Sequence, residues 1–243
     1  MGSLKAALQR VPGLVATYRH VQLLSTVAYE RWWVDVPRRN DQAILNGEWH
    51  FESSVEQQRY RSVLAAVASL RGPAPWGDVL EIGCAEGLFT GELVRRAASV
   101  TACDVSAIAC ERTALAVSGA RVRRVDISRE AVEGTFDLVF LMCVLGTLHG
   151  RRTLKRVSAN LAHALRPGGL LIFNELRFHD SRIEGSWWAR ALVEGGLELV
   201  SFLDGRDGLR LIHEEDHRAH VIGVYEASGV QPSRASRKIM RFS

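Results

Sequence analysis

A glycine-containing turn between an apolar run and an amphipathic stretch constrains the fold of this chain most strongly. The apolar run Val79-Leu80 leads into Glu81-Ile82-Gly83-Cys84-Ala85-Glu86-Gly87, and the amphipathic stretch over residues 88–97 follows. This order is typical of a strand, a tight turn and a helix whose backbone holds a nucleotide-like ligand. Glycine has no Cβ atom, so it permits both the tight turn and the close approach of the ligand.

A carboxylate follows the turn at a distance that suits the same ligand. Residues 100–103 form the next apolar segment, which ends at Asp104, 23 residues after Glu81. At the end of a second strand, this side chain is placed to accept hydrogen bonds from two ribose hydroxyls. The turn and the acid together predict a ligand that contains a nucleoside.

Apolar and helical segments continue to alternate along the chain. We predict further strands at residues 122–125, 136–142, 165–173, 197–203 and 220–225. We predict helices at residues 57–70, 106–118, 151–165 and 186–195, and a charged loop at residues 204–217. The pattern indicates an α/β, Rossmann-like, doubly wound and mostly parallel seven-stranded sheet with an N-terminal helical cap. The expected regions are a cap or lid at 1–76, a core at 77–228 and a basic, disordered tail at 229–243.

The order of these motifs resembles class I S-adenosylmethionine (SAM) dependent methyltransferases over residues 78–227. Ala85 stands where that family has the middle glycine of its first motif, and Asp104 matches its ribose-binding acid. Asp126 and Ile127 match the pair that holds adenine, with a carboxylate for the exocyclic amine and an apolar side chain for the ring. The resemblance implies that these residues bind SAM: Glu81, Gly83, Cys84, Ala85, Gly87, Asp104, Val105, Asp126, Ile127 and Cys143.

A dinucleotide-binding enzyme is the competing interpretation of the glycine turn. Three residues separate Gly83 from Gly87, so the pattern G-x-G-x-x-G is not met. In addition, Glu86 at the helix N-terminus would repel a diphosphate. Both observations favour the methyltransferase.

Candidates for a general base follow the predicted fourth and fifth strands, because ligands of such sheets bind at the carboxyl ends of the strands. His149 follows the fourth strand, and Glu175 and His179 follow the fifth. A neutral imidazole can take a proton from the acceptor near pH 7. The alternative is that His149 begins the next helix and that the other two are loop residues.

A second resemblance concerns the segment before the core. Glu48-Trp49-His50-Phe51, followed by Ser53, Glu56, Arg59 and Tyr60, resembles NodS-type methyltransferases, which N-methylate an amino sugar at the end of a chitin-like oligosaccharide. This implies a small polar acceptor, such as a sugar, a glycan or a secondary metabolite, methylated at nitrogen or oxygen. We expect Trp49, Phe51 and Tyr60 to form a lid over the site. The alternative is that they pack the N-terminal helix onto the sheet.

Several function classes are disfavoured by what the chain lacks. It has neither the Asn/Asp-Pro-Pro-aromatic motif nor a Pro-Cys pair, so methylation of nucleic acid is disfavoured. The run His213-Glu214-Glu215-Asp216-His217 lacks an H-E-x-x-H pattern, so we expect a solvated charge run and no metal. The chain contains no run of 18 apolar residues, so its sequence does not predict a membrane span. Four cysteines without a C-x-x-C pair indicate a reducing cytoplasm.

Two alternatives stay open beside a small-molecule methyltransferase. The net charge is +4, and Arg234, Arg237, Lys238 and Arg241 lie in a tail without acids, where an RNA or protein methyltransferase could contact its substrate. The chain could also be a SAM-binding partner subunit without catalysis. The sequence predicts neither the acceptor nor the oligomeric state.

Overall fold

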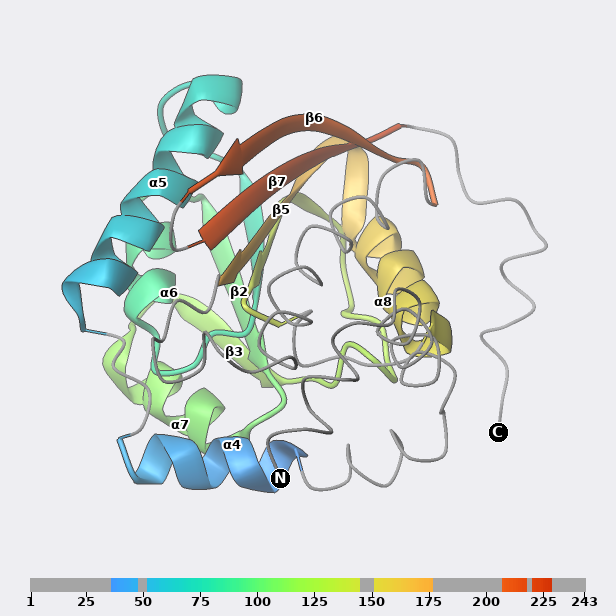
Figure 1. The fold of residues 1–243 in the computed structure, drawn as a ribbon. Coiled ribbons are helices and arrows are strands. Elements are labelled where there is room, and N and C mark those ends of the chain that lie inside the picture. The colour runs from blue at the N-terminus through green and yellow to red at the C-terminus, as the bar shows by residue number, and fades with distance from the viewer. Residues whose placement is uncertain (1–35, 48–51, 145–150, 177–206, 218–219, 229–243) are drawn as a thin grey trace, which may run out of the picture.

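A computed structural model describes residues 36–47, 52–144, 151–176, 207–217 and 220–228 (Figure 1). The described helices are α4 (Val36–Leu45), α5 (Ser54–Arg71), α6 (Leu88–Val94), α7 (Ala107–Ala116) and α8 (Arg151–Ala164). The described strands are β1 (Asp78–Ile82), β2 (Ser99–Asp104), β3 (Ala120–Arg124), β4 (Phe136–Met142), β5 (Leu165–Leu176), β6 (Leu209–Asp216) and β7 (His220–Ala227). The helix expected at 186–195, the strand expected at 197–203 and the tail lie outside the described residues.

The seven strands form one sheet in the order β3-β2-β1-β4-β5-β7-β6. Strands β1 to β5 are parallel to one another, whereas β7 is antiparallel to both β5 and β6. This confirms the predicted α/β class and the mostly parallel seven-stranded sheet. From β1 the chain adds β2 and β3 on one side and then crosses to add β4 on the other side of β1. Open α/β sheets bind their ligands at such a point, where the strand order reverses.

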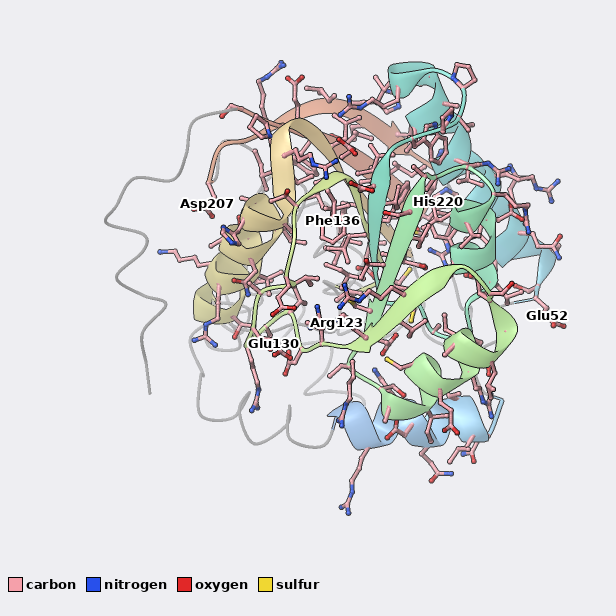
Figure 2. The ribbon with its side chains drawn as sticks, turned by 180° about the vertical axis from the view of Figure 1, so that it is seen from behind. Glu52, Arg123, Glu130, Phe136, Asp207 and His220 are labelled. Carbon is pink, nitrogen blue, oxygen red and sulfur yellow. The ribbon has the colours of Figure 1, made fainter. Side chains whose placement is uncertain are left out.

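Helices cover both faces of the sheet (Figure 1). One hydrophobic core lies between the sheet and helices α5 and α6, with Val63, Val67 and Leu93 among its members. The other lies between the sheet and α8, around Leu154, Val157 and Leu161. Figure 2 shows the same two layers from behind, with Phe136 in the sheet. Alternate residues of each central strand therefore belong to opposite cores, which explains their nearly continuous apolar sequences.

The N-terminal helices start at side chains suited to that position. The Ser53 hydroxyl accepts a hydrogen bond from Glu56 N at the start of α5, as an N-cap residue. Pro37 lies in the first turn of α4, where its missing N–H leaves no bond unmade. Helix α4 lies beside α7, where Ser106 Oγ donates to Asp41 and Arg112 Nη1 donates to the carbonyl of Ile44.

Two sequence-based expectations are wrong. The charged stretch 204–217 is not a loop throughout, because residues 209–216 form strand β6, paired with β7. Leu209 and Leu211 turn inward there, whereas Glu214 is exposed and Glu215 is bonded to His213 and His217. Glu175 does not follow the fifth strand but lies within it, opposite Val221. The division into cap, core and tail stays a prediction.

Candidate active site

A pocket opens at the carboxyl ends of the parallel strands, where β1, β2 and β4 end and the chain leaves β3. Nine of the ten residues predicted to bind the cofactor line it: Glu81, Gly83, Cys84, Ala85, Asp104, Val105, Asp126, Ile127 and Cys143. These residues come from four segments spread over residues 81–143 of the chain, yet they meet at one site. Their roles in binding stay predictions.

Gly87, the tenth residue, does not line the pocket, and glycine is required at this position for a different reason. Its φ is 86°, and a Cβ atom there would lie 3.2 Å from Thr113 Cα in α7. Gly83 has a φ of 89°, and a Cβ atom there would lie 2.8 Å from the carbonyl oxygen of Met142. Both glycines are therefore required by the packing of the turn against its neighbours, whether or not a ligand is bound.

Ala85, in the place of a glycine, adopts the left-handed backbone region with a φ of 49°. Two hydrogen bonds hold it there: its N–H donates to Asp104 Oδ2 at 3.1 Å, and its carbonyl accepts from Thr113 Oγ1 at 3.0 Å. This conformation is unfavourable for a residue that carries a Cβ atom. The backbone of the turn is thus strained at Ala85, the position where class I methyltransferases have glycine.

Asp104 connects the turn to the following helix. Its Oδ1 accepts from the backbone N–H of Ser106 at 2.9 Å, and its Oδ2 accepts from Ala85 N. Burial raises the pKa of Asp104, whereas these backbone hydrogen bonds lower it. A carboxylate offers about four lone-pair sites, so two donors leave acceptor capacity toward the pocket.

Glu81 is the most deeply buried acid of the pocket, at 1% exposure. Thr90 Oγ1 donates to its Oε2 at 2.6 Å. Burial raises the pKa of Glu81 to about 8, although the hydrogen bond from Thr90 lowers it; the charge of Asp104 raises it further. This carboxyl group is therefore largely protonated at neutral pH in the free protein.

The loop after β3 presents Asp126 and Ile127 to the pocket. Asp126 Oδ1 accepts from the backbone N–H and the hydroxyl of Ser128, at 3.0 and 2.5 Å. Asn160 Nδ2 of α8 donates to the carbonyl of Ile127 at 2.9 Å. These bonds hold the loop rigidly, and they leave the apolar side chain of Ile127, only 4% exposed, against the pocket.

Arg59 is a pocket residue that the sequence reasoning did not assign to the site. It is 4% exposed, forms an ion pair with Glu56, and donates from Nη1 to Asn174 Oδ1 at 2.5 Å. Its guanidinium lies 4.9 Å from the ring centre of Tyr60, which also lines the pocket and packs on Phe89. Burial raises the pKa of Tyr60. The signal for Arg59 was present in the sequence, within the segment from Glu48 to Tyr60.

The remaining candidates are only partly described. Trp49 and Phe51 of the expected lid, and His149 and His179, lie outside the described residues. Glu175 is buried and does not line the pocket. Side chains alternate along a strand, and Asn174 meets Arg59 of α5, so Glu175 lies on the α8 face of the sheet.

Neither a metal site nor a membrane-spanning helix is found among the residues that the structure describes. No group of three His, Cys, Asp or Glu side chains there could hold a metal ion. Within the same ranges, no helix is long and apolar enough to cross a membrane.

The strand order, with one antiparallel strand near the edge and a pocket at the strand ends, defines the class I methyltransferase fold. The solved structure of the N-methyltransferase NodS from Bradyrhizobium japonicum WM9, in complex with S-adenosyl-L-homocysteine (SAH), has this fold. It matches with a TM-score of 0.57 at 19% sequence identity, over 77% of this chain and 98% of that chain.

The family follows from the sequence comparison. The model of the family Nodulation protein S (NodS) matches residues 38–207, so the chain belongs to the NodS family. Nodulation protein S of Rhizobium tropici is 27% identical over 57% of this chain, and that of Bradyrhizobium diazoefficiens is 34% identical over 55%. The matched regions span 58% and 64% of the length of those two relatives.

Proposed function

We propose that this protein transfers a methyl group from SAM to a nitrogen or oxygen atom of a small polar acceptor, such as a sugar, a glycan or a secondary metabolite. The observation that carries the proposal is the meeting of the turn, Asp104 and the Asp126-Ile127 pair around one pocket. Membership of the NodS family and the resemblance of residues 48–60 to its members support a sugar-like acceptor.

The chemistry of the pocket fits the parts of SAM. Asp104 accepts from the ribose hydroxyls, while Asp126 and Ile127 hold the adenine. SAM carries a sulfonium and an ammonium group. The carboxylate of Asp104 supplies negative charge at the turn, and the bound cation favours ionisation of Glu81 as well. Arg59 uses three of its N–H groups on Glu56 and Asn174. Of the five N–H groups that a guanidinium has, two remain for the carboxylate of the methionine part.

The main requirement that the reaction sets for the protein is to position the acceptor relative to the methyl group. SAM supplies an electrophilic methyl group whose positively charged sulfur is already a good leaving group. The side chains around the pocket hold the acceptor atom in line with that methyl group, and this orientation accounts for much of the rate. His149 is the proposed base that removes the acceptor's proton, with His179 as the next candidate. Glu175 is not a candidate, because it lies within β5 and does not line the pocket.

Three further points belong to the same proposal. Trp49, Phe51 and Tyr60 form a lid that excludes water from the reacting centre. The N-terminal residues 1–76 act as its cap, and the core spans 77–228. The protein works in the cytoplasm, in keeping with its four free thiols.

Two measurements test the function. Titration calorimetry with SAH is expected to show binding to the wild-type protein, and a methyl-release assay with pooled sugar, amine and hydroxyl acceptors is expected to show turnover. Absence of SAH binding would overturn the proposal. Binding without turnover on any small acceptor would instead favour a SAM-binding partner subunit.

A further inference from the structure

A cluster of histidines lies beside the pocket, at the same edge of the sheet. His220 begins β7 opposite Leu176, the last residue of β5. Two residues later, Ile222 packs into the core below α5, so His220 lies on the α5 face as well. Figure 2 labels His220 on that side of the sheet.

The imidazole of His220 has an unmet hydrogen-bonding group. The residue is 4% exposed, and its Nε2 atom is buried with no hydrogen-bond partner among the residues that the structure describes. Burial lowers the pKa of His220 to about 4, and the charges of His217 and Arg59 act in the same direction. The ring is therefore neutral at physiological pH. A buried polar atom without a hydrogen-bond partner destabilises a fold. The packing of the chain does not explain this atom, but a bound ligand that hydrogen-bonds to it would.

The side chains around His220 are all held by other bonds. The ring of His217 stacks on that of His220 with centroids 4.4 Å apart. His217 Nε2 and His213 Nε2 hydrogen-bond the two oxygens of Glu215 at 2.7 and 2.8 Å. Burial raises the pKa of Glu215, but these two histidine bonds outweigh it and keep that pKa below its ordinary value, so this carboxylate is ionised. On the other side, Arg59 is fixed by Glu56 and Asn174. Arg59, Glu215 and His217 thus form a frame beside the imidazole of His220.

The frame is continuous with the proposed cofactor pocket. Arg59 lines that pocket, and Cys143, another lining residue, donates its N–H to the carbonyl of Asn174 at 2.8 Å. From the end of β4 to the start of β7 is two strand spacings, or about 10 Å. This separation matches the reach of a small acceptor whose reacting atom lies at the pocket and whose other end extends across β5.

We propose that His220 is an acceptor-binding residue, whose Nε2 atom hydrogen-bonds an uncharged hydroxyl group of a sugar-like acceptor lying across the ends of β5 and β7. A hydroxyl can donate to or accept from an imidazole nitrogen, so it suits either tautomer. A protonated amine is disfavoured at this point by the nearby charge of Arg59. A hydroxyl of the acceptor therefore lies at His220, and the atom that is methylated lies at the other end, in the pocket. The inference rests on the proposed function and refines its acceptor class.

The test compares substitutions at His220 by calorimetry with SAH-saturated protein and the glucosamine tetrasaccharide as probe. His220→Phe keeps the ring that stacks on His217 but removes Nε2, and we expect it to weaken probe binding about tenfold or more. His220→Gln restores a polar end, and we expect its affinity within about threefold of wild type. The control is His163→Phe on the exposed face of α8, which is expected to leave probe affinity unchanged.

The outcomes separate this inference from the function on which it rests. Loss of SAH binding in the wild type would overturn the proposed function itself. If SAH binds but the tetrasaccharide does not bind the wild type, or binds His220→Phe equally well, the acceptor site at His220 is refuted. We also expect His220→Phe to melt no lower than the wild type, because no bond within the protein is lost. A clearly lower melting temperature would show that Nε2 has a partner within the protein. It would refute the observation on which the inference rests, namely that this atom is unpaired.

Discussion

The buried carboxyl group of Glu81 makes the stability of the unliganded protein depend on pH in a defined way. Its pKa rises from 4.5 in the unfolded chain to about 8 in the fold. Below pH 4.5 both states hold the proton. Between these values only the unfolded state releases it, so the free energy of unfolding falls as the pH rises, and the fall ends above pH 8.

The substitution Glu81→Gln removes this titration and keeps the shape of the side chain. The amide oxygen still accepts the hydrogen bond of Thr90. At about 1.36 kcal/mol per pH unit, the interval from 4.5 to about 8 corresponds to roughly 5 kcal/mol at most. We expect Glu81→Gln to match the wild type near pH 4.5 and to exceed it in stability by several kcal/mol at pH 8.

Urea denaturation of both proteins at pH values from 5 to 9 measures the effect. The control is Glu133→Gln, at a side chain that is 79% exposed, whose stability curve should run parallel to that of the wild type. Parallel curves for Glu81→Gln and wild type between pH 5 and 8 would refute the reasoning. The more stable variant should also bind SAM more weakly at pH 8, because the cationic ligand favours an ionised carboxylate.

Three other substitutions test the site. Asp104→Asn keeps the side-chain shape but removes the charge that faces the ribose hydroxyls, and it should weaken SAH binding by about 10–100-fold in calorimetry; unchanged affinity would exclude Asp104 as the ribose ligand. Ala85→Gly relieves the strain of the positive φ of 49° and should raise the free energy of unfolding by about 0.5–1 kcal/mol. The control Ala109→Gly, in helix α7, should lower the free energy of unfolding by about 1 kcal/mol. A loss of stability in Ala85→Gly would contradict the strain. His149→Ala should reduce turnover by about 10²-fold with little change in SAM affinity, and an amine acceptor should recover part of the rate at higher pH. Wild-type turnover at neutral pH would exclude His149 as the base.

The sequence predicted the sheet, and the positions of residues at the ends of its strands, because both depend on local patterns. Strand β4 was expected at residues 136–142 and lies there, since a strand buried on both faces has an uninterrupted apolar sequence. Asp104 was placed correctly at the end of β2 because the preceding residues are apolar up to that point.

The failures arise where contacts between distant segments decide the structure. The charged sequence of β6 resembles a loop, and only its pairing with β7 and the bonds of Glu215 make it a strand. The glycine at position 83 was attributed to ligand approach, but a Cβ atom there would collide with the carbonyl of Met142, 59 residues away in the chain. The burial of Arg59 depends on Asn174, which no local pattern connects to α5.

The contact between α4 and α7 has a consequence for the exchange of the cofactor. Asn40 and Ile44 of α4 line the pocket, while Asp41 and the carbonyl of Ile44 are bonded to Ser106 and Arg112. Ser106 is also the residue whose N–H holds Asp104. A ligand that engages Asp104 therefore stabilises the docking of α4, and by thermodynamic reciprocity the docked helix raises the affinity for that ligand by the same factor. The strength of ligand binding thus depends partly on a contact between two helices that lies outside the reacting centre.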